Sequence, residues 1–308
     1  MDFRRLRYFV AIVDAGSVSK ASAQVRIAQP ALSQQLLTLE TEVGARLVDR
    51  TSHGITTTSA GRRLYRHALT ILRQVEEARR HTRDDTDDID GVVSVALPTS
   101  VATILALPLL DAVRTRYPGI HLHLIEAFSG HIMELTNNNR VDLSVLFTDT
   151  PGKGITARQI LSQKLYLISK QRGDDDQQAT ISMRDMKARK MVLPSPSHSL
   201  RSLIDQSFAR LGIELNVVSD VDSLPLLRTM AERGIADTIL PICVLSRGAG
   251  AQHLSAQQLT GPGINRPISI CVPEGLPPSP AAALVSDVLV ETVGTLVNQG
   301  IWAGAHLV

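Results

Sequence analysis

Apolar residues recur at helical spacing through most of the first ninety residues. The pattern predicts three short helices: one that ends at Gly16-Ser17, a second over 17–27, and a third over 29–43 after a tight turn near Ile27-Ala28. Pro30 suits the first turn of the third helix, where a missing backbone N–H is harmless. The N-terminal part of the chain is therefore expected to be mainly helical.

Residues 46–61 interrupt the helices with short β-prone pieces, and the turn at His53-Gly54 predicts a small hairpin. A long helix follows from Ser59 to about Arg83, and the acidic residues 84–91 predict a linker. The apolar seam of that helix alternates in steps of four and three, as in a coiled coil: Leu64, Ala68, Ile71, Val75, Ala78 and Thr82. Because about two and a half heptads are marginal alone, we expect the seam to pack against a second copy of the chain.

After Gly91 the pattern changes to strands that alternate with helices. Strands are expected at 92–98, 120–127, 141–147, 164–170, 190–195, 215–221, 237–245 and 266–275, and helices at 100–117, 130–140, 198–212, 224–234 and 280–299. Apolar strands in this order predict an α/β body with mostly parallel sheets and right-handed crossovers. The chain thus divides into an all-α winged head over 1–61, a linker helix and linker over 62–90, and a body over 91–308.

Composition places the chain among ordinary globular proteins, but its two parts differ in charge. The 308 residues are 44% hydrophobic and 20% charged, which suits about two domains with real cores. Residues 1–83 carry 14 Lys and Arg against 7 Asp and Glu, and the remainder carries 18 against 23. A basic head on an acidic body fits a nucleic-acid-binding module, with ordinary solvated charge as the alternative. Aromatic residues make up only 3%, which argues against binding by base stacking.

Candidate chemistry for an enzyme or a metal site is sparse. Cys243 and Cys271 have no metal-binding spacing and are expected to be buried free thiols in a reducing compartment. His121 and His123 share one strand face, but no third metal ligand is evident. The sequence contains neither a nucleophile elbow nor a Gly-rich phosphate loop, so we expect no enzyme and no cofactor. Because the sequence shows no signal peptide and no stretch of membrane-spanning length, we expect a cytoplasmic protein.

One extended motif runs through the head, in order and without gaps: Gln29-Pro30-Ala31, Ser33, Gln35, Leu39-Glu40, Gly44, Leu47, Arg50, Thr56 and Gly61. On these residues the head resembles the DNA-binding domain of the LysR-type transcriptional regulators, and within them the nitrogen-assimilation-control regulators and their sulfur-assimilation relatives. The resemblance implies a winged helix-turn-helix, a dimerising linker helix, and a two-lobed α/β body of the periplasmic-binding-protein type.

The third helix carries the residues expected to read DNA. The N-terminal end of a recognition helix enters the major groove deepest, and Gln29, Ser33 and Gln34 lie there on a face free of the Leu36/Leu39 stripe. Glutamine can bond the N6 and N7 atoms of adenine, whereas serine is less discriminating. Thr38, one turn further along, is placed to reach a phosphate. Simple surface polarity is the alternative for all four residues.

The resemblance implies further DNA contacts and partners. Pro30 and Ala31 would contact thymine methyl groups, and Arg50 and His53 in the wing would lie near the backbone or minor groove. Paired linker helices would present two recognition helices with two-fold symmetry, so an interrupted inverted repeat is the expected operator. The family also implies dimers of dimers that bend DNA, and RNA polymerase as a partner.

A small effector bound between two lobes is the remaining implication of the resemblance. Lobe I would cover about 91–162 and 267–308, and lobe II about 163–266. The chain would cross between them near Ile160–Lys164 and return near Asn265–Ile268. Ligands of such lobes lie beyond the carboxyl ends of the strands.

Two hydroxyl-rich segments, 97–100 and 193–199, follow strands and run directly into helices. Two helix N-termini that face each other favour a small anion, such as a carboxylate or sulfate. The expected contacts are Thr99, Ser100, Ser197 and Ser199, with Phe128, Ser129, Phe147, Thr148 and Thr238 as further candidates. Ordinary helix caps in a regulator that needs no effector are the alternative. A free solute-binding protein is another class, against which the helix-turn-helix head argues.

Overall fold

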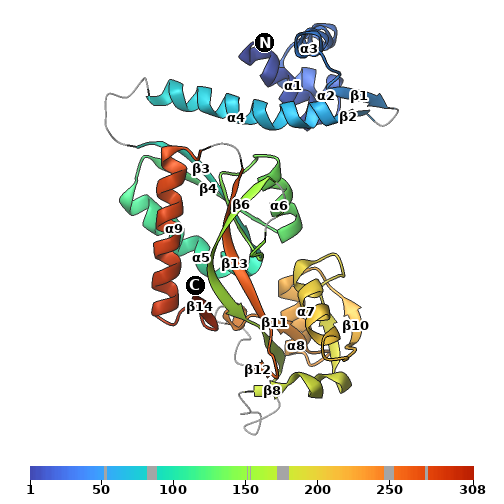
Figure 1. Ribbon diagram of the computed structural model, residues 1–308, viewed down its shortest axis with the longest axis vertical. Helices are drawn as coiled ribbons and strands as arrows, with labels where there is room; N and C mark the ends of the chain where they lie inside the picture. Colours follow the sequence, from blue (N-terminus) through green and yellow to red (C-terminus); the bar gives the residue numbers. More distant parts are fainter. Residues whose placement is uncertain are drawn as a thin grey trace. The chain divides into compact units, whose positions relative to one another are not determined.

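The chain forms two compact units, residues 1–91 with Asn138–Arg140 and the rest of the chain, and each is described by itself (Figure 1). The computed structural model describes residues 1–51, 54–81, 89–150, 152, 154–171, 180–245, 253–274 and 277–308. His53, the last seam position Thr82, the expected helix end Arg83 and residues 84–88 of the expected linker lie outside the described residues.

The N-terminal unit has the predicted helix-turn-helix, wing and long helix. Its elements are α1 (Phe3–Ala15), α2 (Val18–Val25), α3 (Gln29–Val43), β1 (Val48–Thr51), β2 (Gly54–Thr57) and α4 (Ser59–His81). Asp2 and Ser17 cap α1 and α2 by accepting hydrogen bonds from backbone N–H groups of the first turns. Gly16 ends α1 in the left-handed conformation, which glycine adopts without strain. The predicted helix ends agree with the structure to within about two residues.

Leucines on the inner face of α3 hold this helix against the rest of the unit. Leu32, Leu36 and Leu39 are buried in one cluster with Phe9 and Ile12 of α1. Burying each leucine contributes roughly 1.5–3 kcal/mol. Because these residues recur every three or four positions, the opposite face of α3 remains free for another partner.

Backbone contacts tie the wing to the helices. On α3, Glu40 Oε1 accepts a hydrogen bond from the Leu47 N–H at 2.7 Å. On β2, the Ile55 N–H donates to the Gly16 carbonyl oxygen at 2.8 Å. The start of α4 passes so close to the chain before β1 that a Cβ added at Gly61 would lie 1.9 Å from the Leu47 carbonyl oxygen. This approach requires glycine at position 61.

The first lobe of the C-terminal unit is a six-stranded sheet with helices on both faces. In spatial order its strands are β14 (Ala305–Leu307), β6 (Ile155–Lys164), β13 (Asn265–Pro273), β5 (Leu143–Leu146), β3 (Gly91–Pro98) and β4 (Ile120–Ala127). Val93 and Val95 of β3 share a hydrophobic cluster with α5 (Thr99–Arg116) and α9 (Pro280–Asn298). Ala96 belongs instead to a cluster that includes Ile132 of α6 (Ser129–Asn137). Alternate side chains of β3 therefore fill the cores on opposite faces.

The second lobe combines a four-stranded sheet with a parallel pair of strands. The sheet order is β11 (Thr238–Leu240), β7 (Tyr166–Lys170), β12 (Leu254–Thr260) and β8 (Thr180–Ser182). The parallel pair is β9 (Lys190–Leu193) and β10 (Asn216–Asp220), and the helices of this lobe are α7 (Ser199–Ala209) and α8 (Leu224–Glu232). Within the described ranges, this lobe also contains the 3₁₀ helices η1 (Met183–Ala188) and η2 (Ile242–Leu245).

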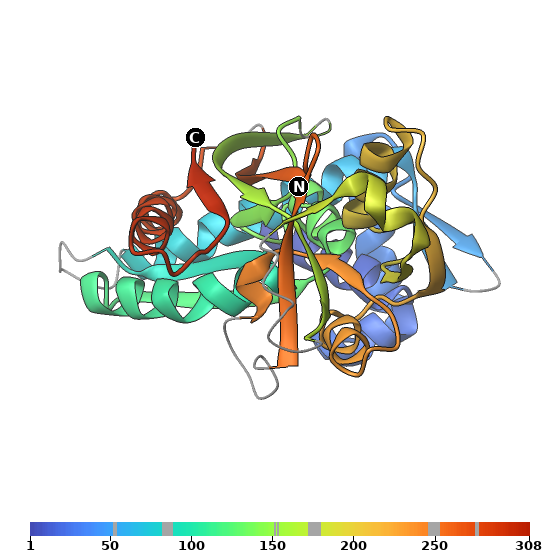
Figure 2. The ribbon, with the colours of Figure 1, turned by 90° about the horizontal axis from the view of Figure 1, so that it is seen from below.

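Two long strands connect the lobes. β6 and β13 pair antiparallel from Lys164 opposite Asn265 to Ile155 opposite Pro273. They run side by side in the view of Figure 1 and in the perpendicular view of Figure 2. The two crossings expected from the sequence therefore form one two-stranded hinge.

The sheets are mixed, and the expectation of mostly parallel sheets was wrong. β3 and β5 are parallel, but β13 is antiparallel to β5 and β6, and β7 is antiparallel to β11 and β12. The chain leaves the first lobe and later returns to it, so the returning strand runs opposite to the outgoing one. The strand expected over 237–245 ends at Leu240, since Pro241 has no N–H to donate to the sheet, and η2 follows.

The last helix is a core element of the first lobe. Among the described helices, α9 is the one whose length and mean hydropathy of 1.5 would also suit a membrane span, which the sequence analysis did not expect. Its residues Val285, Leu289 and Val293 are buried in the same cluster as β3. Trp302, which follows α9, is 1% exposed. The apolar character of this segment is explained by packing within the lobe.

We predict that Gly61→Ala destabilises the N-terminal unit by about 1–3 kcal/mol, because the new methyl group must displace backbone and not a flexible side chain. Thermal unfolding followed by circular dichroism measures the effect. Gly294→Ala within α9 is the control, since a Cβ there meets nothing within 4 Å and alanine favours a helix. A Gly61→Ala midpoint equal to that of the wild type would contradict the close approach.

Candidate functional site

The outer face of α3 presents polar side chains opposite the buried leucines. Gln29, Pro30, Ala31 and Gln34 are exposed, and Ser33 is half-buried. The residue at the N-cap of α3 is an alanine, and no side chain caps the first turn. The first N–H groups of the helix therefore remain available to an acceptor such as a phosphate.

A groove lies along this face of α3. The residues that line it are Pro30, Ser33, Gln34, Leu36, Leu37, Glu40, Arg46 and Val48. Leu37 is 55% exposed and Arg46 is also exposed, and neither was singled out from the sequence. Leu37 comes four positions after Ser33 and so lies on the same face of α3, and this spacing is the signal that could have identified it. An apolar side chain beside a cation suits a surface that meets base edges and phosphates together.

Two polar residues of the sequence motif, Gln35 and Glu40, make hydrogen bonds within the N-terminal unit. Gln35 accepts a hydrogen bond from Arg5 Nε at 3.2 Å, which connects α3 to α1. Glu40 holds the Leu47 N–H at the start of the wing. These two motif residues therefore build the domain.

The remaining expected DNA contacts are less open. The Thr38 hydroxyl donates to the Gln34 carbonyl oxygen at 2.9 Å, so it must rotate before it can donate to a phosphate. The side chain of Arg50 and all of His53 lie outside the described residues, so their contacts with DNA stay predictions.

A cleft with a cavity volume of about 50 Å³ lies between the two lobes of the C-terminal unit. Five of the expected effector contacts line it: Thr99, Ser100, Phe128, Ser129 and Phe147. The other lining residues are Pro98, Ala127, Pro194, His198, Leu200, Val221, Asp222, Ser223, Leu224, Leu227, Leu240, Pro241 and Arg266. Most of the lining is apolar, and a few polar groups are placed to orient a ligand.

Four of the expected contacts do not line this cleft as the described residues form it: Thr148, Ser197, Ser199 and Thr238. Ser197 and Ser199 are exposed. His198 lines the cleft in their place and also caps α7, because its Nδ1 accepts a hydrogen bond from the Leu200 N–H at 3.1 Å. Thr238 is buried within β11.

Arg266 on β13 is the main polar group of the cleft, and the sequence analysis missed it. Its side chain is 3% exposed. Nε and Nη2 donate to Gln163 Oε1 at 3.0 and 2.7 Å, and Nη2 also donates to Ser100 Oγ at 3.0 Å. The guanidinium carbon lies 3.8 Å from the centroid of the Phe147 ring. Burial lowers the pKa of Arg266 to about 10, so the side chain is still a cation at neutral pH.

The charge of Arg266 has no carboxylate partner within 4.0 Å among the described residues. Its bonded acceptors, Gln163 and Ser100, are both neutral. A charged residue in a strand of mostly apolar residues was the signal in the sequence that could have identified it.

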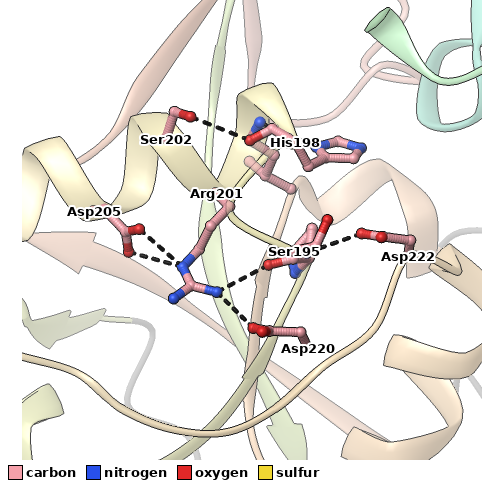
Figure 3. A network of polar contacts seen from close by, with 9 residues as sticks. Ser195, His198, Arg201, Ser202, Asp205, Asp220 and Asp222 are labelled. Carbon is pink, nitrogen blue, oxygen red and sulfur yellow. Dashed lines mark hydrogen bonds and ion pairs between the residues drawn. The ribbon is translucent and has the colours of Figure 1, made fainter. Parts of the chain in front are cut away.

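A polar network holds the wall of the cleft that belongs to the second lobe (Figure 3). Arg201 on α7 donates from Nε to both carboxylate oxygens of Asp205 at 2.9 Å. Its Nη1 donates to Asp220 Oδ1 at 2.7 Å and to the Pro194 carbonyl oxygen at 3.0 Å. These bonds fix the loop between β9 and α7, which carries the cleft residue His198.

Asp222 and His198 are the polar groups on that wall. Asp222 Oδ1 accepts a hydrogen bond from the Ser195 N–H at 2.8 Å, and this bond lowers the pKa of the carboxyl group. The His198 ring meets Phe128 of the first lobe edge to face, with centroids 5.8 Å apart. Burial lowers the pKa of His198 despite the opposing effect of Asp222, so the ring is neutral at pH 7.

Hydrogen-bond donors on the first-lobe side of the cleft lack side-chain acceptors among the described residues. The residue at the N-cap of α5 is Pro98, and no side chain caps this helix. Its first-turn N–H groups thus carry the positive end of the helix dipole toward Thr99 and Ser100. Ser129 Oγ is buried and has no partner in the described ranges.

Comparison with protein families matches nearly the whole chain. The model of the bacterial regulatory helix-turn-helix protein, lysR family, matches residues 3–62. The LysR substrate binding domain matches residues 86–294. The nitrogen assimilation regulatory protein nac of Escherichia coli is 32% identical over 300 residues, which cover 97% of each chain. The transcriptional regulator BbuR of Bordetella bronchiseptica is 26% identical over 304 residues, or 99% of this chain and 94% of BbuR.

Solved structures show the same fold. A full-length OxyR variant from Pseudomonas aeruginosa superimposes with a TM-score of 0.71 at 17% identity, covering 95% of this chain and 97% of that one. Full-length CbnR in complex with its target DNA gives a TM-score of 0.56 at 22% identity, covering 95% and 99%. With its helix-turn-helix head and two-lobed α/β body, the chain belongs to the LysR family of transcriptional regulators, which bind DNA and are not enzymes.

Proposed function

We propose that the chain reads its operator through the N-terminal half of α3, with Gln29, Ser33 and Gln34 on base edges. The observation that carries this proposal is the exposed polar end of α3 beside a helix face locked into the core by Leu32, Leu36 and Leu39. A rigidly held helix with free polar side chains at its N-terminal end is what major-groove reading needs. Pro30 and Ala31, both exposed, are in the same part of the helix and suit thymine methyl groups.

Phosphate contacts surround this reading face. The uncapped first turn of α3 supplies backbone donors, and exposed Arg46 supplies a charge. Arg50 and His53 of the wing reach the backbone or the minor groove, and Thr38 rotates toward a phosphate. Direct base contacts give sequence preference, whereas these phosphate contacts give affinity and orientation.

The regulator acts as a homodimer through α4, assembles further into a dimer of dimers, and influences RNA polymerase at promoters in the cytoplasm. The later part of the α4 seam supports this proposal, since Ile71 and Val75 continue the coiled-coil spacing and remain partly exposed, whereas Leu64 packs against the core of the N-terminal unit and Ala68 is buried in the chain itself. Two-fold symmetry then makes the operator an interrupted inverted repeat.

The cleft of the C-terminal unit senses a small effector. Thr99, Ser100, Phe128, Ser129 and Phe147 line it, which supports their role as effector contacts. Effector binding between lobes joined by two hinge strands changes how the lobes are held together, and operator affinity or geometry responds through α4.

We predict that Gln29→Ala/Ser33→Ala weakens binding to the operator by about 1–3 kcal/mol, because base-edge hydrogen bonds are lost. Gel shifts on the DNA upstream of the regulator's own gene, across a salt series, measure it. Gln206→Ala on the exposed face of α7 is the control of the same residue type in the other unit. Wild-type affinity and sequence preference in the double variant would show that α3 does not read the bases.

Arg46→Ala is expected to act differently. Loss of a phosphate contact weakens binding about equally on all sequences and reduces the slope of log K against log salt by about 1. Parallel titrations with operator and random duplex compare the two slopes. A loss confined to the operator sequence would contradict the assignment of Arg46 to a phosphate.

Thr99→Ala/Ser100→Ala is expected to abolish the effector-dependent promoter response, since both side chains line the cleft and Ser100 bonds Arg266. A reporter fused to the target promoter measures the response under inducing growth conditions. Thr115→Ala, exposed near the other end of α5, is the control. A normal response in the double variant would contradict the assignment of the cleft as the sensing site.

A further inference from the structure

Arg266 gives the cleft a positive charge that the described part of the chain does not balance. Nε and Nη2 are bonded to neutral oxygens of Gln163 and Ser100, and Nη1 makes no hydrogen bond to a described residue. An isolated charge is unfavourable in a low-dielectric interior, so buried cations are normally paired. Within the part of the chain that the structure describes, no anion therefore balances this charge.

Neighbouring groups do not supply the missing negative charge. Cys243, whose Sγ lies 3.2 Å from Gln163 Nε2, remains a thiol because burial raises its pKa. His198 is neutral at pH 7. Asp222 also lines the cleft, but it is bonded to the Ser195 N–H and lies beyond the ion-pair distance of 4.0 Å from Arg266.

Two independent features of the first lobe point to an anion at the same place. The N-terminus of α5 is uncapped beside Ser100, the residue that bonds Arg266. Ser129 lines the cleft and is 8% exposed. Its Oγ has no hydrogen-bond partner among the described residues. An oxyanion between these groups would accept hydrogen bonds from all of them.

The small volume and the lining of the cleft favour a small anion with one negative charge. A volume of about 50 Å³ holds roughly three to five water-sized groups. On the side of the second lobe the lining is largely apolar, with Leu200, Leu224 and Leu227. One buried cation balances one negative charge, and the Asp222 carboxylate opposes a second one.

We propose that the effector is a small monocarboxylate of about two to four carbons, with its carboxylate on Arg266 and the N-terminus of α5. Its apolar end then lies against the leucines of the second lobe, so that one ligand contacts the first lobe, the hinge and the second lobe. This inference rests on the proposed function in one respect, namely that the cleft is the sensing site.

Isothermal titration of the full-length chain tests the proposal with three probes at constant ionic strength. Sodium propionate is the monocarboxylate, propionamide is its neutral counterpart of the same shape, and sodium sulfate is an inorganic dianion. We expect single-site binding of propionate, with propionamide and sulfate at least about tenfold weaker. Equal binding of propionamide would show that charge does not matter, and equal or tighter binding of sulfate would show an inorganic oxyanion site. Either result overturns the proposal.

Variants locate the carboxylate. Arg266→Gln is expected to weaken propionate binding at least about tenfold, and Arg266→Lys less, because lysine keeps the charge but not the two-pronged donor geometry. Arg158→Gln makes the same charge change at an exposed position on the neighbouring strand β6 and should bind propionate as the wild type does. Wild-type affinity in Arg266→Gln would overturn the assignment. The comparison of the three probes on the wild type tests the proposal even if Arg266→Gln fails to fold.

A gel shift on the same preparation separates this inference from the proposed function. If the wild type binds its operator but no propionate, the effector class is wrong and the regulator function stands. If propionate binds but no duplex does, the reading of DNA by α3 fails and the ligand assignment stands.

Discussion

The burial of Arg266 without a carboxylate partner among the described residues is the constraint on which the sensing unit depends. Moving a guanidinium out of water costs several kcal/mol even after the surroundings relax. Part of this cost is offset by Gln163 across the hinge, Ser100 at the start of α5, and the Phe147 ring. Because these three groups come from β6, α5 and the end of β5, the same charge joins the hinge to the first lobe. The second lobe meets the cleft with mostly apolar side chains, and it contributes no cation that would compete for an anion among its described lining residues.

In the DNA-binding unit, by contrast, charged side chains stay at the surface, and packing in the apolar core fixes the position of α3. Leu32, Leu36 and Leu39 fix α3, while Glu40 and Gly61 fix the wing and the start of α4. The matched motif thus contains two kinds of residue. One kind builds the domain, and the other, such as Gln29 and Ser33, is left on the surface of α3. A family motif therefore cannot be taken as a set of DNA contacts without the structure.

Much of the fold could be predicted because the signals were local. Helical spacing gave the head, and the change of pattern after Gly91 gave the α/β body. The strands β6, β8, β12 and β14 were missed as elements, since their sequences are polar or short and they are stabilised by distant partners such as β13, β7 and β12. The mixed direction of the sheets depends on where the chain returns between lobes, and no local periodicity carries that information.

The candidate sites show the same limit. Hydroxyl groups at helix starts singled out Thr99 and Ser100, which line the cleft, and also Ser197 and Ser199, which do not. Which residue of a loop turns inward depends on contacts such as the Arg201 network and the His198 cap, which are not local in the sequence. Arg266 was missed because its strand lies more than 160 positions from Ser100, as its hydrogen bond to that residue records.

A crystal structure of the full-length chain grown with propionate would test the central claim most directly, namely that the cleft is completed by an anion at Arg266. The account predicts a carboxylate within hydrogen-bond distance of Arg266 Nη1 and of the first N–H groups of α5, with the apolar end toward Leu224 and Leu227. A structure in which Arg266 instead pairs with a carboxylate of the chain itself, and propionate is absent from the cleft, would contradict it.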